Sequence, residues 1–291
     1  MKKTLRLLAA LTSLVIAQTL FAAPLSTVEA VQAPAWLERN GTTQPLAPGL
    51  TLSTGDIVHT GKGARAYLLL AEGSRVKLGE SASFALHSHS RQPEKSLRGV
   101  LNVITGAFRF TTNAIRTRST SERDIAIRVG TATIGIRGTD IWGRSSRERD
   151  IVALIEGRIE VTRADETKEL AEPMTYFDAP REGSTLIRPL ESGQLSVWAR
   201  ETDILPGDGA LRSKGAWRVR ITTVDEEKRA LALYDYLREG GFAARIRPIL
   251  AEDGSTWRYE LFISGFINRN EAANAAARIT ELTGLAASTG Q

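Results

Sequence analysis

The strongest constraint on the fold is the order of elements predicted by the C-terminal stretch from Trp217 to Ser288. Val219 and Ile221 alternate with polar residues, which is typical of a strand with one buried face. A helix is expected to open at Asp225 and to end at the Gly240-Gly241 pair. Its predicted apolar stripe consists of Ala230, Leu233, Tyr234 and Leu237.

The remainder of this stretch predicts two more strands, a second helix and a last edge strand. The strands are expected at residues 243–250 and 257–263, with a turn at Asp253-Gly254 between them. Asn268 and Glu271 stand at the N-cap and N3 positions of the second helix, and residues 285–287 can supply the last strand. The result is a small α+β unit with the order βαββαβ, in which two helices cover one face of the sheet and leave the other face open.

The N-terminus predicts export from the cytoplasm. Three basic residues, Lys2, Lys3 and Arg6, precede an apolar run, and small residues follow it before Pro24. The run is shorter than the roughly 20 residues of a membrane-spanning helix, so a cleaved signal peptide over residues 1–22 is expected, with no transmembrane segment after cleavage. The mature protein is then expected in the periplasm. Export removes cytoplasmic RNA as a partner, although the βαββαβ order alone would suggest an RNA-recognition-like sheet, and no nucleic acid partner is expected.

The amino-acid composition excludes cysteine-based chemistry. The chain has 291 residues and no cysteine, so disulfides and thiolate catalysis are excluded. The formal charge of +5 includes the three basic residues of the signal peptide, and their loss leaves the mature chain at +2. The length predicts two domains.

Residues 26–177 predict an all-β domain, a sandwich or roll of many short strands. Turn signals at Gly55-Asp56 and Glu72-Gly73 separate short alternating segments, and no amphipathic helix interrupts them. The two apolar segments 151–155 and 159–161, joined at Glu156-Gly157, predict a hairpin.

Several motifs of this domain resemble the FecR domain family, in the right order over most of residues 45–165. They are Gly55-Asp56-x-Val58-x-Thr60-Gly61-x-Gly63, Leu70-Ala71-Glu72-Gly73-Ser74-x-Val76, Gly106-x-Phe108-Arg109-Phe110, Ile134-Gly135-Ile136-Arg137-Gly138-Thr139-Asp140 and Leu154-Ile155-Glu156-Gly157-Arg158-Ile159-Glu160-Val161. The best-known members of that family are periplasmic regulators that couple an outer-membrane transporter to a cytoplasmic sigma factor. The cytoplasmic segment and spanning helix of those regulators have no counterpart here, so the resemblance implies the periplasmic β module, and contact with a sigma factor is not expected.

The polar residues of this domain do not predict an enzyme. The segment Arg137-Gly138-Thr139-Asp140 could cradle an anion, but it lacks P-loop spacing, and turn-forming glycines explain it more simply. His87 and His89 share a strand face without a third ligand, so no metal site is expected. No nucleophile–base pair stands out, and neither catalytic residues nor a cofactor are predicted.

Two further segments have a distinctive composition. Residues 91–150 hold twelve Arg or Lys against six Asp or Glu, which favours a solvated basic surface. Residues 178–215 are rich in proline and glycine and predict a linker, whose first part packs on the β domain through Trp198 and whose flexible part is expected at residues 206–215.

The C-terminal unit, residues 216–291, resembles the SPOR domain, a peptidoglycan-binding module with the order βαββαβ. The resemblance is carried by Arg218-Val219-Arg220-Ile221, by the passage from Leu237-Arg238 to Arg245-Ile246, and by Tyr259-x-Leu261-x-Ile263-Ser264-Gly265-Phe266-x-Asn268-Arg269-x-Glu271-Ala272. Family members bind glycan strands stripped of stem peptides through the open sheet face, so the resemblance implies glycan-binding roles for Arg220, Arg258 and Phe262, flanked by Arg218 and Arg247. Two departures from the family pattern, Arg220 for a frequent Gln and Glu260 for a frequent Arg, imply altered binding, for which Arg258 could compensate.

Together these observations predict a periplasmic, non-catalytic binding protein that attaches to denuded glycan strands of peptidoglycan, with division sites as its expected location, and presents a FecR-like interaction module. The alternative is an envelope signalling protein whose FecR-like domain contacts a membrane transporter or regulator while the C-terminal domain binds protein.

Overall fold

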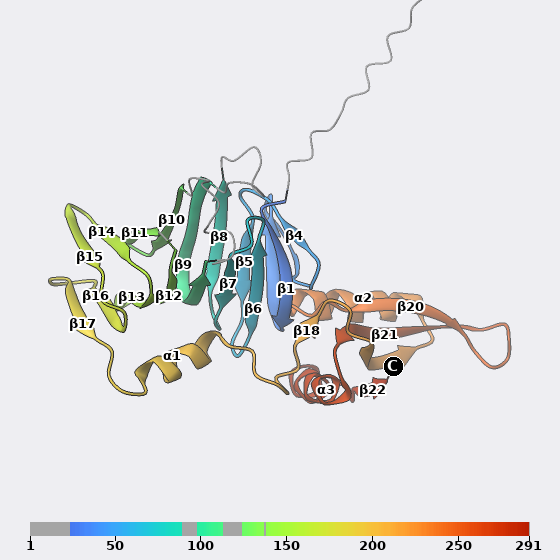
Figure 1. The fold of residues 1–291 in the computed structure, drawn as a ribbon. Helices are drawn as coiled ribbons and strands as arrows, with labels where there is room; N and C mark the ends of the chain where they lie inside the picture. The colour runs from blue at the N-terminus through green and yellow to red at the C-terminus, as the bar shows by residue number, and fades with distance from the viewer. Residues whose placement is uncertain (1–23, 89–97, 113–123, 137, 291) are drawn as a thin grey trace, which may run out of the picture.

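The computed structural model describes residues 24–88, 98–112, 124–136 and 138–290. It shows a β sandwich with a small α+β domain beside it (Figure 1). The signal peptide expected at residues 1–22, and parts of the basic stretch 91–150, lie outside the described residues. Among the described residues, no helix combines the length and apolar character needed to cross a membrane.

The sandwich consists of two sheets, here named sheet A and sheet B. In pairing order, sheet A contains β17 (Leu186–Pro189), β16 (Thr175–Pro180), β13 (Arg149–Glu156), β12 (Asp140–Ser145), β9 (Arg98–Thr111), β7 (Arg75–Leu78), β6 (Arg65–Leu70) and β1 (Ser26–Gln32), and β1 also pairs with β4 (Thr51–Leu52). Sheet B contains β3 (Thr42–Pro45), β2 (Ala35–Arg39), β5 (Ile57–Thr60), β8 (Ser83–Ser88), β9, β10 (Asp124–Val129), β11 (Ala132–Ile136), β14 (Ile159–Arg163) and β15 (Glu166–Leu170).

Strand β9 belongs to both sheets and joins them at a corner. Its first part pairs with β8 and runs parallel to β10, while its second part pairs with β7 and β12. The strand bends at Gly106, which has φ +89° and sits so close to Ala82 that a Cβ atom would lie 2.5 Å from it. Glycine is therefore required at the corner.

The core lies between the two sheets. Alternate residues of each strand point inward, and the largest fully buried side chains there include Phe84, Phe108, Phe110 and Phe177. Burying one such phenylalanine stabilises the folded domain by about 1.5–3 kcal/mol. The predicted all-β domain is thus held together by one continuous apolar core.

The hairpin predicted at residues 151–161 is wrong. β13 pairs with β12 and β16 in sheet A, whereas β14 pairs with β11 and β15 in sheet B, so the chain crosses from one sheet to the other at Gly157. Gly157 has φ +92°, and a Cβ atom there would lie 2.4 Å from the carbonyl oxygen of Gly138. Both faces of β13 are buried, which is typical of a strand packed on both sides and not of a two-stranded hairpin with one open face.

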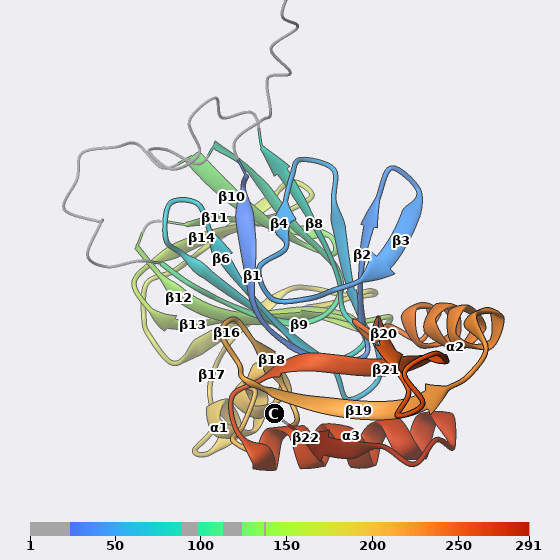
Figure 2. The ribbon, with the colours of Figure 1, turned by 90° about the vertical axis from the view of Figure 1, so that its right-hand side faces the viewer.

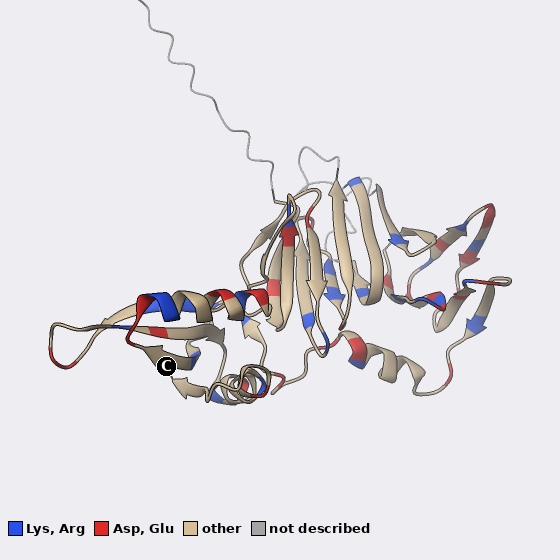
Figure 3. Ribbon diagram, turned by 180° about the vertical axis from the view of Figure 1, so that it is seen from behind, with Lys and Arg blue, Asp and Glu red and all other residues tan. Residues whose placement is uncertain are grey.

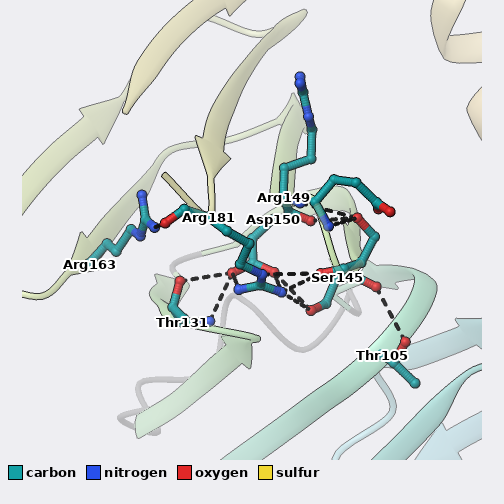
Figure 4. A network of polar contacts seen from close by, with 9 residues as sticks. Thr105, Thr131, Ser145, Arg149, Asp150, Arg163 and Arg181 are labelled. Carbon is teal, nitrogen blue, oxygen red and sulfur yellow. Dashed lines mark hydrogen bonds and ion pairs between the residues drawn. The ribbon is translucent and has the colours of Figure 1, made fainter. Parts of the chain in front are cut away.

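A buried carboxylate ties the crossing strands together (Figure 4). Asp150 is fully buried at the start of β13 and accepts hydrogen bonds from both ends of the Arg181 guanidinium, at 2.7 and 2.9 Å. It also accepts from the Ser145 hydroxyl at 2.8 Å and from the backbone N–H and the hydroxyl of Thr131, both at 2.9 Å. Both oxygens of the Asp150 carboxylate are therefore fully hydrogen-bonded by groups from β12, the β10–β11 turn and the segment after β16. These hydrogen bonds offset the cost of burying the charge.

The segment predicted to be a linker is ordered along the sandwich. It contains β17, the helix α1 (Gln194–Thr202) and the short strand β18 (Leu211–Arg212). Trp198 of α1 stacks on Trp142 of β12 with ring centroids 4.5 Å apart, and Tyr176 meets Trp198 edge-on at 5.3 Å. The packing of the first part through Trp198 is therefore as predicted.

The C-terminal domain has the predicted order of elements. It contains β19 (Trp217–Val224), α2 (Glu227–Glu239), β20 (Arg245–Leu250), β21 (Trp257–Phe266), α3 (Arg269–Thr283) and β22 (Ser288–Gly290). Its sheet has the order β20–β21–β19–β22, all antiparallel. Both helices pack their alanine and leucine residues onto the same sheet face, around Val219, Leu261 and Ile263.

Two details of this domain differ from the sequence prediction. The helix α2 begins two residues after Asp225, whose carboxylate instead accepts a hydrogen bond from Arg258 at 2.6 Å. The last strand begins at Ser288, three residues later than expected, because Leu285 and Ala287 pack against the domain core.

The two domains share backbone pairing. Strand β18 pairs with β1 of the sandwich on one side and with the end of β21 on the other, so that sheet A continues into the C-terminal sheet (Figure 2). Beside it, the indole N–H of Trp36 donates to the Glu239 carbonyl at 3.0 Å, and the Ala35 N–H donates to the Gly241 carbonyl at 3.2 Å.

Glu271 fixes the end of the linker. The Asn268 side chain accepts from the Glu271 N–H at 2.9 Å, as predicted for an N-cap, but the Glu271 carboxylate points to the linker. It accepts from the backbone N–H groups of Gly207, Gly209 and Ala210 at 2.8, 2.7 and 3.1 Å, and it is buried. Hence the part of the linker predicted to be flexible is held by a charged acceptor on α3.

Replacing Asp150 with asparagine should lower the free energy of unfolding by about 3 kcal/mol, because Arg181 then lies against a site that no longer carries its counter-charge. Urea unfolding followed by tryptophan fluorescence measures the change. The matched control is Arg158→Ala, which breaks an exposed pair with Glu169 and should cost less than about 1 kcal/mol. Equal losses in the two variants would contradict this account.

Replacing Glu271 with glutamine should cost about 2 kcal/mol and speed hydrogen exchange at Gly207, Gly209 and Ala210, because the amide offers one neutral acceptor where the carboxylate offers two charged ones. Glu281→Gln on the exposed side of α3 is the control. Unchanged hydrogen exchange at the amides of Gly207, Gly209 and Ala210 would show that the Glu271 carboxylate does not hold the linker.

Candidate functional site

The open face of the C-terminal sheet carries the candidate site. Side chains alternate along β19 and β21, and those facing the helices are buried, such as Val219 and Ile263. The opposite face presents Arg218 and Arg220 from β19 and Phe262 from β21, none of them buried. From β20, both Arg245 and Arg247 are exposed, so three neighbouring strands contribute to one surface.

Glu260 is the centre of this surface. Its carboxylate is only 1% exposed and accepts from the Arg220 Nε at 2.5 Å and from the Arg247 Nη2 at 2.6 Å. The register explains the second contact, since Arg247 lies directly opposite Glu260 in the β20–β21 pair. Two guanidinium groups thus cover one buried carboxylate and are themselves held in fixed positions.

Phe262 lies beside this ion pair. Its partners in the register are Arg220 on β19 and Arg245 on β20. The guanidinium carbon of Arg218 lies 5.9 Å from the Phe262 ring centroid, and that of Arg247 lies 5.7 Å from it. Cations at these distances interact with the ring quadrupole and orient the ring within the surface.

The cluster has a net positive charge. It combines the guanidinium groups of Arg218, Arg220, Arg245 and Arg247 with the single carboxylate of Glu260, which gives +3. Within the described chain, no carboxylate lies at ion-pair distance from Arg218 or Arg245. By contrast, the helix α2, on the other side of the sheet, carries both signs of charge along its length (Figure 3). A flat ring surrounded by fixed donors can bind an anionic or hydroxyl-rich ligand.

Four of the five residues expected at the site lie together, and the fifth does not. Arg218, Arg220, Arg247 and Phe262 form the cluster with Glu260, whereas Arg258 forms an ion pair with Asp225 at the far end of the same strand face. The expectation that Arg258 compensates for Glu260 in glycan binding stays a prediction. The role of Glu260 as the shared acceptor was not predicted, because only the register between the strands brings it to both arginines.

Two carboxylates of the FecR-like motifs form ion pairs within the sandwich. Asp140 accepts from the Arg109 guanidinium at 3.0 and 2.7 Å, and this hydrogen bonding raises the pKa of Arg109. Asp56, which is buried, accepts from Arg39 at 2.8 Å and raises the pKa of that arginine. Gly138 and Gly157 permit the close backbone approach described above, which agrees with the structural interpretation of this segment; Arg137 lies outside the described residues.

His87 is exposed at the end of β8, and His89 lies outside the described residues. Over the ranges that the structure covers, no group of three or more His, Cys, Asp or Glu is arranged to hold a metal ion.

Replacing Glu260 with glutamine should raise the affinity of the folded chain for a polyanion such as heparin several-fold at low salt, because the counter-charge inside the arginine cluster is lost. Heparin chromatography at two salt concentrations measures the effect, and Glu252→Gln on the exposed β20–β21 turn is the control. Retention that does not change, or that changes equally in both variants, would contradict a concentrated positive surface at this face.

Comparison with known proteins finds a family match for part of the chain. Two crystal structures of a candidate anti-sigma factor from Parabacteroides distasonis ATCC 8503 align with 14% and 13% sequence identity. Each alignment covers 78% of this chain and 92% or 91% of that chain, with a TM-score of 0.42. This level of similarity does not establish a common fold. No curated protein matches the sequence. The likeness of residues 216–291 to SPOR domains stays a prediction from sequence. Residues 56–160, from the start of β5 into β14, match the family model described as FecR protein.

Proposed function

We propose that this chain is a non-catalytic regulatory protein of the cell envelope, in which the FecR-like sandwich binds another envelope protein. The observation that carries the proposal is the FecR match over residues 56–160 in a chain whose N-terminus predicts export. The match covers the centre of both sheets, and on this proposal the sandwich corresponds to the β module of that family, whose best-known members couple an outer-membrane transporter to a cytoplasmic sigma factor.

The free edge of sheet A supports protein binding. Among the described residues, β17 pairs only with β16, and all four residues of β17 are exposed. Leu186 and Ile187 are 47% and 43% exposed, and Met174, just before β16, is 42% exposed. An exposed edge strand with apolar side chains can pair with a strand of another protein.

Site-specific photocrosslinking in living cells tests this proposal. A photoreactive amino acid at Leu186 or Ile187 should give an adduct with a defined membrane or periplasmic protein, whereas Leu282, which is 55% exposed on α3, should give none. Ile187→Lys, which places a charge on the edge, should remove the adduct at Leu186. Adducts that persist in that variant, or that form equally from Leu282, would contradict binding at β17.

A second function is favoured by the arginine cluster at the open face of the C-terminal sheet. Glycan strands present sugar faces, amides and lactyl groups, for which an aromatic ring within fixed guanidinium donors is suited. The convergence of Arg218, Arg220 and Arg247 around Phe262 supports peptidoglycan as a ligand of this face.

Co-sedimentation of the chain lacking residues 1–22 with purified sacculi tests the second function. Binding should increase after amidase treatment removes stem peptides, and Phe262→Ala should weaken it by about tenfold, the effect of losing roughly 1.4 kcal/mol of stacking. Arg258→Ala is the matched control, because Arg258 lies on the same face outside the cluster. Binding that does not change after amidase treatment, or an equal loss of binding in both variants, would contradict glycan recognition at this face.

A further inference from the structure

A cavity of about 480 Å³ lies at the corner of the sandwich under α1. Its walls come from the start of β6, the turn after β7, the bend of β9, the end of β12 and the C-terminal turn of α1. A volume of this size falls in the range of small-molecule sites in proteins. Neither the FecR-like motifs nor the C-terminal face accounts for it.

The fold creates this space at the point where β9 leaves sheet B for sheet A. Gly106 lines the space at the bend of β9, and α1, which stacks Trp198 on Trp142, contributes Glu201 to the wall. Strands and their turns therefore supply most of the wall, and the docked helix supplies one charged residue.

The lining is charged, with both signs present. Arg144 donates to both oxygens of Glu201 at 3.0 and 3.2 Å, and burial raises the pKa of Glu201. Glu80 accepts from the Gly63 N–H at 2.6 Å. The lining also holds three guanidinium groups, of Arg65, Arg144 and Arg147, so with these two carboxylates it carries a net charge of +1.

Two of the arginines have no carboxylate partner among the described residues. Arg65 donates to the carbonyl oxygens of Ala64 and Arg200, and its Nε is buried with no acceptor in the part of the chain that the structure describes. Arg147 is exposed at the rim, in the turn between β12 and β13. The terminal nitrogens of Arg65 and the guanidinium group of Arg147 can therefore donate to a carboxylate supplied by a ligand.

We propose that this cavity binds an acidic amino acid or a short acidic peptide with a free amino group and a net charge of −1. Carboxylates of the ligand bind Arg65 and Arg147, and its ammonium group lies near Glu80 and Glu201. A ligand with negative charge alone would place some of that charge against the two carboxylates, and an apolar ligand would desolvate all five charged groups without replacing their contacts. The proposal is independent of the function proposed for β17 and for the C-terminal face.

The site has a built-in optical reporter. The Arg144 guanidinium lies 5.6 Å from the Trp142 ring centroid, and Trp142 stacks on Trp198. A ligand that changes the charge around Arg144 is therefore expected to change the fluorescence of this tryptophan pair.

The test is calorimetric titration of the chain lacking residues 1–22 with the dipeptide Ala-Glu, followed in parallel by tryptophan fluorescence. We expect saturable binding with a fluorescence change, and much weaker binding of Ala-Lys and of N-acetyl-Ala-Glu, which reverse or remove one of the required charges. Arg147→Ala should weaken Ala-Glu binding about tenfold, the loss expected for one charge-assisted hydrogen bond.

Arg200→Ala is the matched control, because Arg200 is an exposed arginine of α1 that does not line the cavity and contacts Arg65 through its backbone only. Thermal unfolding confirms that both variants are folded. The proposal is overturned if Ala-Glu shows no saturable binding up to about 10 mM, a concentration above the range of weak specific sites. It is equally overturned if Ala-Lys binds as well as Ala-Glu, or if Arg200→Ala weakens binding as much as Arg147→Ala.

Discussion

The arrangement of this molecule depends on the attachment of the linker at both of its ends. At one end, the stacked pair of Trp142 and Trp198 holds α1 on the sandwich. At the other, the buried carboxylate of Glu271 collects three backbone N–H groups, and β18 pairs with a strand of each domain. Backbone N–H groups of a glycine-rich segment would otherwise bind water and leave the segment free, so a single buried carboxylate has a large effect on its order. The two domains therefore behave as one body.

Because the two domains form one body, the three surfaces described above keep fixed positions relative to one another. The edge strand β17, the cavity under α1 and the arginine cluster of the C-terminal sheet lie on elements connected by hydrogen bonds and packing. The cavity is the intermediate point, because α1 forms part of its wall and leads into the linker that Glu271 holds. Binding energy gained at the cavity would stabilise the docked helix, and any partner that favours the docked helix would in turn favour the ligand. Such a coupling suits a regulatory protein better than a passive anchor.

The order of elements could be predicted from the sequence where periodicity and turn residues specify it. The βαββαβ unit and its open face follow from strand alternation, from the apolar stripe of the first helix and from Gly240-Gly241, and the N-cap at Asn268 follows from its spacing to Glu271. The all-β character of residues 26–177 follows from short alternating segments. Pairing between strands could not be predicted in the same way. The segments around Gly157 have the pattern of a hairpin, and the crossing between sheets depends on a close approach of Gly157 to Gly138 that is 19 residues away in the chain.

The candidate site shows the same limit at the level of single residues. Alternation placed Arg218, Arg220, Arg247 and Phe262 on one face, but the register decides that Glu260 meets two of these arginines while Arg258 meets Asp225. Likewise Glu271 has the spacing of a capping residue, and only the tertiary fold shows that its carboxylate binds the linker. The local sequence pattern indicates which side chains share a face, whereas strand register and tertiary packing determine which charged groups form ion pairs.

The central claim, that the linker joins the two domains into one body, is tested most directly by a distance measurement between them. The chain has no cysteine, so Arg75→Cys on the sandwich and Glu281→Cys on α3 provide two unique sites for spin labels. Pulsed electron paramagnetic resonance should give one narrow distribution of distances between the two spin labels, and the distribution should broaden when the Glu271→Gln substitution is added. A broad distribution in the chain with its native Glu271 would contradict the account, because it would mean that the domains move independently.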